Sequence, residues 1–175
     1  MPLGFRHCDP RFPFLWQAAE QPAARWHAKG EGPANYFADT PVGAWAEFIR
    51  HKGITEAVDL AGIRRSLWVA ELPGDGYAQP RLPDTTLFGN ESAYAACQAE
   101  ATRLREGGAE RIEVPGAALM PGTASGWTAT PTLATATPAR DGIVWVLFGR
   151  CDVTARLAVE GGAPPELVLS LVRHL

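Results

Sequence analysis

The chain has little of what marks membrane, secreted or nucleic-acid-binding proteins. No apolar run approaches the ~18 residues of a membrane span, and the N-terminus lacks a basic segment followed by an apolar stretch of about 7–15 residues. The 16 Lys and Arg residues against 19 Asp and Glu residues give a formal charge of −3, so no overall basic field gathers nucleic acid. We therefore expect no membrane partner and no direct nucleic-acid partner, and any anionic ligand must be held by a local cluster of cations.

Cysteine is scarce, and its arrangement fits neither a disulfide framework nor a metal site. Cys8, Cys97 and Cys151 are an odd number and lack C-x-x-C spacing, which disfavours paired disulfides and a zinc ribbon. The 4 histidines are scattered, and the chain has no H-E-x-x-H motif. These absences predict a cytoplasmic, reducing location and chemistry that uses no metal.

The usual motifs of nucleotide-binding proteins and serine hydrolases are also missing. The chain contains neither G-x-x-x-x-G-K-[ST] nor G-x-S-x-G. The glycines of Gly30–Pro33 lack G-x-G-x-x-G spacing and precede a predicted strand instead of following one. The sequence thus gives no support to ATP binding, to Rossmann-type dinucleotide binding or to a catalytic triad.

What the chain does contain is enough apolar sequence for one domain. With 175 residues, 46% apolar and 20% charged, it can bury a substantial core, and we expect a single domain over residues 1–175. Residues 1–24 hold four prolines together with Phe5, Phe12, Phe14 and Trp16. This composition predicts an irregular arm that packs its rings on the core and covers an edge of the sheet.

The order of the predicted elements indicates the fold class. Two helices are predicted, over residues 41–52 and from about residue 90 to residue 106. Strands are predicted over residues 34–38, 64–72, 111–114 and 143–148, while residues 167–171 fit either a helix or a strand. This is not the strict alternation of a doubly wound parallel sheet, so we expect an α+β fold with a bent, mostly antiparallel sheet and flanking helices.

The helix predicted over residues 41–52 begins at the N-cap Thr40, with proline at its first position. By 3.6-residue spacing, its buried stripe comprises Val42, Trp45, Phe48, Ile49 and Lys52. Glu47 lies off this stripe. It is either a solvated carboxylate that pairs with Arg50 or His51, or a carboxylate that faces a ligand, and periodicity alone favours the first.

Arg25, Tyr36 and Glu47 follow one another at intervals of eleven residues, and they supply a cation, a flat ring and a carboxylate. A site that breaks the bond between nicotinamide and ribose in NAD needs these three groups. The cation holds the diphosphate, the ring stacks on the leaving nicotinamide, and the carboxylate stabilises the positive charge that develops on the sugar.

A pattern around these residues resembles the RES-domain family, named after its Arg, Glu and Ser. Residues Arg25–His51 fit R-W-x-x-x-G-x-G-P-x-x-Y-x-A-x-[ST]-x-x-x-A-x-x-E-x-x-x-H, and the likeness resumes at Val114–Ala118 and Leu171–His174. The family serine, usually within V-P-S-A, corresponds to Gly116 here. Members of the family are NAD-degrading toxins with an ADP-ribosyltransferase-like fold, commonly paired with a helix-turn-helix antitoxin, and the resemblance implies the same for this chain.

The resemblance also implies roles for individual residues. Glu47, Arg25 and Tyr36 would be catalytic, with Glu47 stabilising the oxocarbenium-like sugar, while Arg25, Tyr36, Trp26 and Gly116 would bind NAD. Gly116 removes a hydroxyl that the family places near the site, at a cost of ~1–3 kcal/mol if a ligand group loses its partner. On this reading, Gly116→Ser would raise NAD turnover.

NAD is therefore the expected substrate, and three readings remain open. The first is cleavage of NAD, in which water as the acceptor gives ADP-ribose and inorganic phosphate gives a phosphorylated ADP-ribose. The second reading is ADP-ribosyl transfer to a protein. The third reading is a degenerate RES-like module that binds a nucleotide or a partner without turnover, and it is motivated by Gly116.

Overall fold

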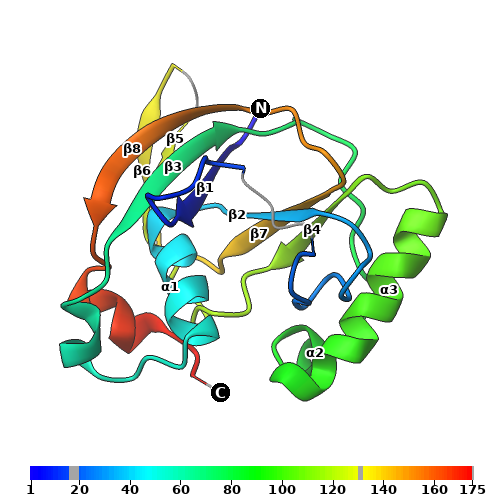
Figure 1. The fold of residues 1–175 in the computed structure, drawn as a ribbon, viewed down its shortest axis with the longest axis horizontal. Helices are drawn as coiled ribbons and strands as arrows, with labels where there is room; N and C mark the ends of the chain where they lie inside the picture. Colours follow the sequence, from blue (N-terminus) through cyan, green and yellow to red (C-terminus); the bar gives the residue numbers. More distant parts are fainter. Residues whose placement is uncertain (16–19, 130–131, 175) are drawn as a thin grey trace.

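The computed structural model describes residues 1–15, 20–129 and 132–174 and is built around a curved six-stranded sheet (Figure 1). The strand order is β4-β7-β2-β1-β3-β8, and each pair of neighbours is antiparallel. The strands are β1 (Leu3–Cys8), β2 (Ala34–Ala38), β3 (Arg65–Glu71), β4 (Arg111–Pro115), β7 (Ile143–Phe148) and β8 (Thr154–Gly162), with β5 (Gly126–Ala129) and β6 (Ala134–Thr137) in a separate hairpin. The expected α+β fold is confirmed.

The helices lie beside this sheet and not on both of its faces in alternation. In Figure 1, α1 lies below β1 and β2, and α3 lies beyond β4 at the opposite side of the view. The α-helices are α1 (Pro41–His51), α2 (Asp84–Leu87) and α3 (Tyr94–Glu106), and the 3₁₀ turns are η1 (Ala57–Leu60), η2 (Glu91–Ala93) and η3 (Glu166–Leu171). Within the described residues, no helix has the length and apolar character needed to cross a membrane.

The N-terminal segment is more regular than its composition suggests. Residues 3–8 form a strand in the interior of the sheet, between β2 and β3, so the prediction of an irregular arm over an edge is wrong for this part. Gly4 allows the close approach, because a Cβ there would lie 2.6 Å from Leu72 Cδ1 and 2.7 Å from Phe37 Cβ. Trp16, also assigned to the arm, falls outside the described residues.

Helix α1 forms where its capping signals predict. Thr40 is its N-cap, and the Thr40 hydroxyl accepts a hydrogen bond of 3.0 Å from the backbone N–H of Gly43. Gly43 also lets the helix lie close to β2, since a Cβ at this position would be 3.2 Å from Ala38 Cβ. Lys52 is exposed, and its assignment to the buried stripe is wrong.

Two apolar clusters hold in place the elements that carry the site. One includes Trp26, Leu87, Cys97, Ile112 and Val146, between α3 and the β4–β7–β2 part of the sheet. The other includes Trp45, Ile49, Leu119, Val168 and Val172, between α1 and the C-terminal segment. Burial of this apolar area contributes most of the stability that holds the polar residues in place.

Candidate active site

A cavity of about 680 Å³ opens between α1, strands β1 and β2 and the segment over residues 21–27. Arg25, Tyr36 and Glu47, which are far apart in the sequence, all line it. The charged residues of its lining are the five cations Arg6, Arg25, Arg50, Lys52 and Arg65 and the two carboxylates Glu47 and Glu91. The chain carries a net charge of −3, yet the lining of this cavity is cationic.

Glu47 enters this cavity from α1. Its Oε1 accepts a hydrogen bond of 3.3 Å from the backbone N–H of Ala118. Burial raises the pKa of Glu47, while the charges of Arg50 and Arg25 and the Ala118 N–H oppose this rise. Glu47 has no ion pair within 4.0 Å among the described residues, so its carboxylate faces the cavity without a salt bridge.

Arg25 and Trp26 diverge because they occupy the tip of a tight turn. The backbone groups of Ala24 and His27 hydrogen-bond to each other on either side of this turn. Arg25 NH1 and NH2 donate to the carbonyls of Thr86 (3.3 Å) and Gly89 (2.7 Å). Trp26 is among the residues that line the cavity, but it is only 2% exposed and its indole packs in the core.

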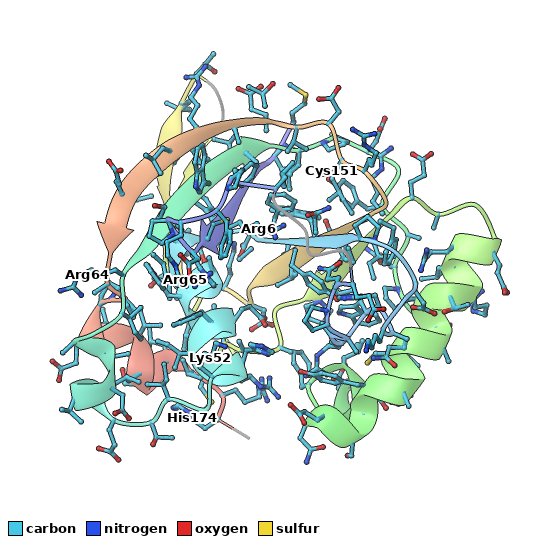
Figure 2. The ribbon with its side chains drawn as sticks, viewed as in Figure 1. Arg6, Lys52, Arg64, Arg65, Cys151 and His174 are labelled. Carbon is cyan, nitrogen blue, oxygen red and sulfur yellow. The ribbon has the colours of Figure 1, made fainter. Side chains whose placement is uncertain are left out.

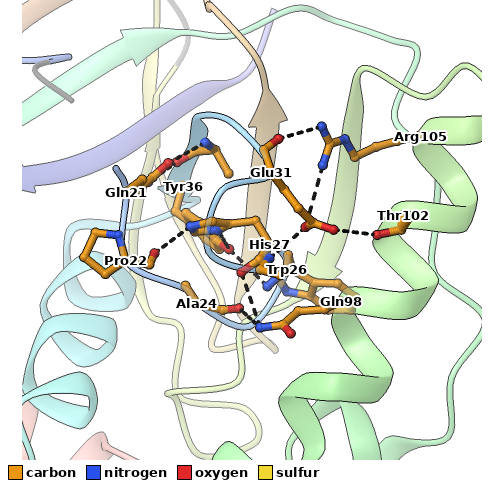
Figure 3. A network of polar contacts seen from close by, with 12 residues as sticks. Gln21, Pro22, Ala24, Trp26, His27, Glu31, Tyr36, Gln98, Thr102 and Arg105 are labelled. Carbon is orange, nitrogen blue, oxygen red and sulfur yellow. Dashed lines mark hydrogen bonds and ion pairs between the residues drawn. The ribbon is translucent and has the colours of Figure 1, made fainter. Parts of the chain in front are cut away.

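Tyr36 lines the cavity, and its hydroxyl is hydrogen-bonded to His27 and to the backbone of Trp26 (Figure 3). His27 Nε2 lies 2.8 Å from the Pro22 carbonyl, which can only accept, so Nε2 carries the proton. His27 Nδ1 then accepts from the Tyr36 hydroxyl at 2.9 Å, and the same hydroxyl accepts from the Trp26 N–H at 3.1 Å. Burial raises the pKa of Tyr36 far above its ordinary value, so the residue contributes a neutral ring.

Helix α3 holds this turn against the sheet, as Figure 3 shows. Gln98 Nε2 donates to the carbonyls of Ala24 (2.8 Å) and His27 (3.3 Å). Further along the loop, Glu31 accepts from the Thr102 hydroxyl at 3.0 Å, and Arg105 donates to the Glu31 carbonyl at 3.0 Å. The loop that carries Arg25 is therefore fixed by side chains from a helix about 70 residues away in the chain.

Arg50 is a site residue that the sequence interpretation treated only as a surface partner of Glu47. Its side chain is buried, and its guanidinium donates to the carbonyl of Ala117 and to those of Phe88 (3.2 Å) and Gly89 (2.9 Å). Gly89 thus accepts from both Arg25 and Arg50. Helical spacing placed Arg50 on the same side as Glu47, and this was the available signal.

The RES domain family model matches residues 5–142, which is most of the chain, including every residue of the Arg25–Tyr36–Glu47 series. The chain belongs to the RES domain family. This family is generally associated with enzymes that act on NAD. A comparison with curated proteins finds no match.

Within this RES domain, Gly116 does not line the cavity, although its neighbours Pro115 and Ala117 do. Its N–H donates to the Gly142 carbonyl at 2.7 Å, and a Cβ at Gly116 would lie 3.2 Å from the Gly142 carbonyl carbon. The structure therefore does not bring Gly116 together with Arg25, Tyr36 and Glu47. The RES motif around it contributes backbone groups instead, through Ala117 and Ala118.

The lining of the RES cavity also contains Arg6, His7 and Arg65, which the sequence interpretation did not select. Figure 2 shows Arg6, Arg65 and Lys52 on the side of β1, β3 and α1. Arg6 belongs to a strand that the sequence interpretation read as an irregular arm, so no strand pattern pointed to it. No group of three or more His, Cys, Asp or Glu side chains within the described ranges could hold a metal ion.

Proposed function

We propose that this protein cleaves the N-glycosidic bond of NAD and releases nicotinamide. One observation carries the proposal: the Glu47 carboxylate lies without a salt bridge in a cationic cavity that it shares with the Tyr36 ring. A cationic wall suits the diphosphate of NAD, a ring face suits nicotinamide, and a carboxylate suits the sugar cation. Membership of the RES domain family supports the choice of NAD.

In the proposed reaction the carbon–nitrogen bond breaks heterolytically. Its electron pair passes to the pyridinium nitrogen, so nicotinamide leaves neutral and the positive charge moves to the ribose. Glu47 stabilises this charge through its carboxylate, which the Ala118 N–H holds in place. Arg25 and Arg50 assist indirectly, since their charges oppose the burial that raises the pKa of Glu47.

The acceptor completes the reaction by adding an oxygen to the sugar carbon and losing a proton. Water would make the protein an NAD glycohydrolase, and inorganic phosphate would make it an NAD phosphorylase. The cations of the cavity suit an incoming phosphate anion, so we propose phosphate as an alternative acceptor. This reaction needs no metal or further cofactor.

Product analysis tests the reaction directly. Purified protein is incubated with NAD with and without phosphate, and the products are separated by chromatography. We expect release of nicotinamide together with ADP-ribose, or with its phosphorylated form when phosphate is present. Circular dichroism of wild type and Glu47→Gln checks that both proteins are folded. Folded wild-type protein that leaves NAD intact under both conditions would refute the proposal.

We further propose that the protein acts as the toxin of a toxin–antitoxin pair in the cytoplasm, where a helix-turn-helix protein restrains it. The support is the family membership and the three unpaired thiols, which suit a reducing compartment. Induced expression in a bacterial host should lower cellular NAD and stop growth, and Glu47→Gln should do neither. Growth arrest that persists in the Glu47→Gln variant would separate toxicity from NAD cleavage.

Gly116 keeps a second function open, a RES-like module that binds NAD without turnover. The family hydroxyl is missing, and the Cβ position of Gly116 faces the Gly142 backbone. Calorimetry that shows NAD binding in a protein that releases no nicotinamide would favour this function over the enzyme.

A further inference from the structure

The cations that line the cavity form no ion pair with a carboxylate of the described residues. The ion pairs found among the described residues involve Arg11, Lys29, Arg103, Arg105, Arg111 and Arg140. None of these residues lines the cavity, and none of the five cavity cations takes part in an ion pair within 4.0 Å. Unpaired like charges repel, so their gathering in an acidic chain favours an anionic ligand.

The cavity cations form two groups that differ in their free hydrogen-bond donors. Arg25 and Arg50 donate to the carbonyls of residues 86, 88, 89 and 117, so their guanidinium groups are largely occupied by the backbone. Arg65 donates only from Nε, to His7 Nδ1 at 2.7 Å, and its two terminal nitrogens have no protein acceptor in the described part of the chain. Arg6 donates from NH1 to the Asn35 side chain at 2.8 Å.

Arg6 and Arg65 are also held in place, as a binding site requires. Arg65 lies over the Phe48 ring at 5.0 Å, and its His7 partner stacks on Trp45 at 5.5 Å. Arg6 lies 5.9 Å from the Phe37 ring centroid. Both guanidinium groups are thus oriented by rings before any ligand arrives.

The carboxylate that acts most on Arg65 has its ion pair elsewhere. Asp9 acts on the charge of Arg65, but its carboxylate is bound by Arg11 at 2.7 Å, outside the cavity. Lys52 is exposed at the mouth of the same cavity and adds a third positive charge.

We propose that Arg6 and Arg65, assisted by Lys52, form the subsite that binds the diphosphate of the dinucleotide substrate. This assignment rests on the proposed NAD cleavage, and it moves the diphosphate contact away from Arg25. Two guanidinium groups with free N–H donors match the oxygens of a diphosphate, whereas Arg25 positions the turn beside Glu47.

The test measures the binding of ADP, which has the diphosphate but neither nicotinamide nor its ribose, by isothermal titration calorimetry. Because a diphosphate loses charge-assisted hydrogen bonds in each case, we expect Arg6→Gln and Arg65→Gln to weaken ADP binding by about tenfold or more. Lys52→Gln, at an exposed position, should weaken it by a smaller factor. Adenosine, which lacks phosphate, should bind equally to all variants.

Arg64→Gln is the matched control, since Arg64 precedes Arg65 but is exposed, bonds to the Ala61 and Ile63 carbonyls and does not line the cavity. Figure 2 shows it at the outer edge of the molecule. Arg64→Gln changes the net charge by the same amount and should leave ADP affinity unchanged. Thermal melts of every variant identify any loss of fold, and Lys52→Gln keeps the test valid if Arg65→Gln unfolds.

Several results would overturn the subsite. These are an unchanged ADP affinity in Arg6→Gln and Arg65→Gln, an equal loss in Arg64→Gln, or no ADP binding by wild type. Inorganic phosphate that binds with the same arginine dependence while ADP does not would assign these residues to a free phosphate instead. Glu47→Gln should bind ADP like wild type, so a protein without NAD cleavage can still confirm the subsite, and the two proposals fail separately.

Discussion

Glu47 is surrounded by groups that act on its charge in opposite directions. Burial favours the neutral acid and raises its pKa, while Arg50, Arg25 and the Ala118 N–H favour the carboxylate. The net rise means that ionising Glu47 is less favourable in the folded protein than in the unfolded chain. At neutral pH its charge therefore destabilises the fold, as is common for groups that are kept for chemistry.

We predict that Glu47→Gln abolishes nicotinamide release without lowering the melting temperature at pH 7. Glutamine keeps the shape of the side chain and an oxygen that can accept from Ala118, but it removes the buried charge. The loss of rate should be at least about 100-fold, as for other electrostatic groups in active sites. NAD turnover and thermal melts check both parts, and a melting temperature well below wild type would assign Glu47 a structural role instead.

Gly116→Ser tests the departure from the family motif. The glycine has no positive φ, but the added Cβ would meet backbone atoms of Gly142 at 3.2–3.5 Å, which cannot move away freely. We predict a loss of ~1–3 kcal/mol of stability and no rise in turnover, contrary to the expectation from the resemblance.

Gly116→Ala is the control for Gly116→Ser, because it adds the same Cβ without a hydroxyl. Chemical denaturation and NAD turnover should give similar values for the two variants. Higher turnover in the serine variant alone would show that the hydroxyl reaches the site and that the family role of this position is retained.

At the scale of elements, the peptide between Ala117 and Ala118 connects α1 to the C-terminal segment. The Ala117 carbonyl accepts from Arg50, and the Ala118 N–H donates to Glu47. The Ala118 carbonyl in turn accepts from the backbone N–H of Arg173 at 2.7 Å. The last residues of the chain therefore support the group that holds the carboxylate.

Arg173→Pro should weaken this support specifically. Proline removes the backbone N–H, and the preceding residue, with φ −78° and ψ 132°, already has the extended conformation that proline requires. We predict a several-fold fall in nicotinamide release, a shift of its acidic limb to higher pH, and a loss of about 1–3 kcal/mol of stability. Arg173→Ala keeps the N–H and should leave the pH profile unshifted; an equal shift in both variants would mean that the side chain and not the hydrogen bond matters.

The elements themselves were predictable to different degrees. Helix α1 has a local code, an N-cap with proline after it, and it formed as predicted. Strand β8 was not predicted, although Thr154–Leu157 alternates polar and apolar residues; its pairing with β3 contains register shifts, and most of its residues are exposed. Strand β1 was missed because the aromatic and proline content of residues 1–24 hid six strand residues.

At the scale of the whole molecule, His7 connects β1, β3 and α1 through Arg65 and Trp45. Burial and the charges of Arg65, Arg6 and His51 lower the pKa of His7 from 6.5 to about 3. Because the folded protein then binds fewer protons than the unfolded chain, this group leaves stability intact above pH 6.5 and removes it as the pH falls from 6.5 towards about 3.

We therefore predict that the free energy of unfolding decreases on acidification below about pH 6.5, by up to about 4 kcal/mol from His7. His7→Gln keeps an acceptor for Arg65 but cannot titrate, so its stability should fall less steeply with pH. His174→Gln, at an exposed position, is the control. Urea unfolding at several pH values checks this, and parallel curves for wild type and His7→Gln would exclude His7 as the acid-sensitive group.

The sequence by itself determined the α+β class, the cap and span of α1, and the membership of Arg25, Tyr36 and Glu47 in one motif, because these depend on local propensity and on spacing along the chain. Only the tertiary structure decided which groups meet. The turn at Arg25–Trp26 packs the indole in the core while the Arg25 guanidinium reaches the Gly89 carbonyl, and strands β1 and β3 bring Arg6 and Arg65 to the lining of one cavity. Such meetings depend on strand register and on helix packing between segments far apart in the chain, and no local pattern of residues encodes them.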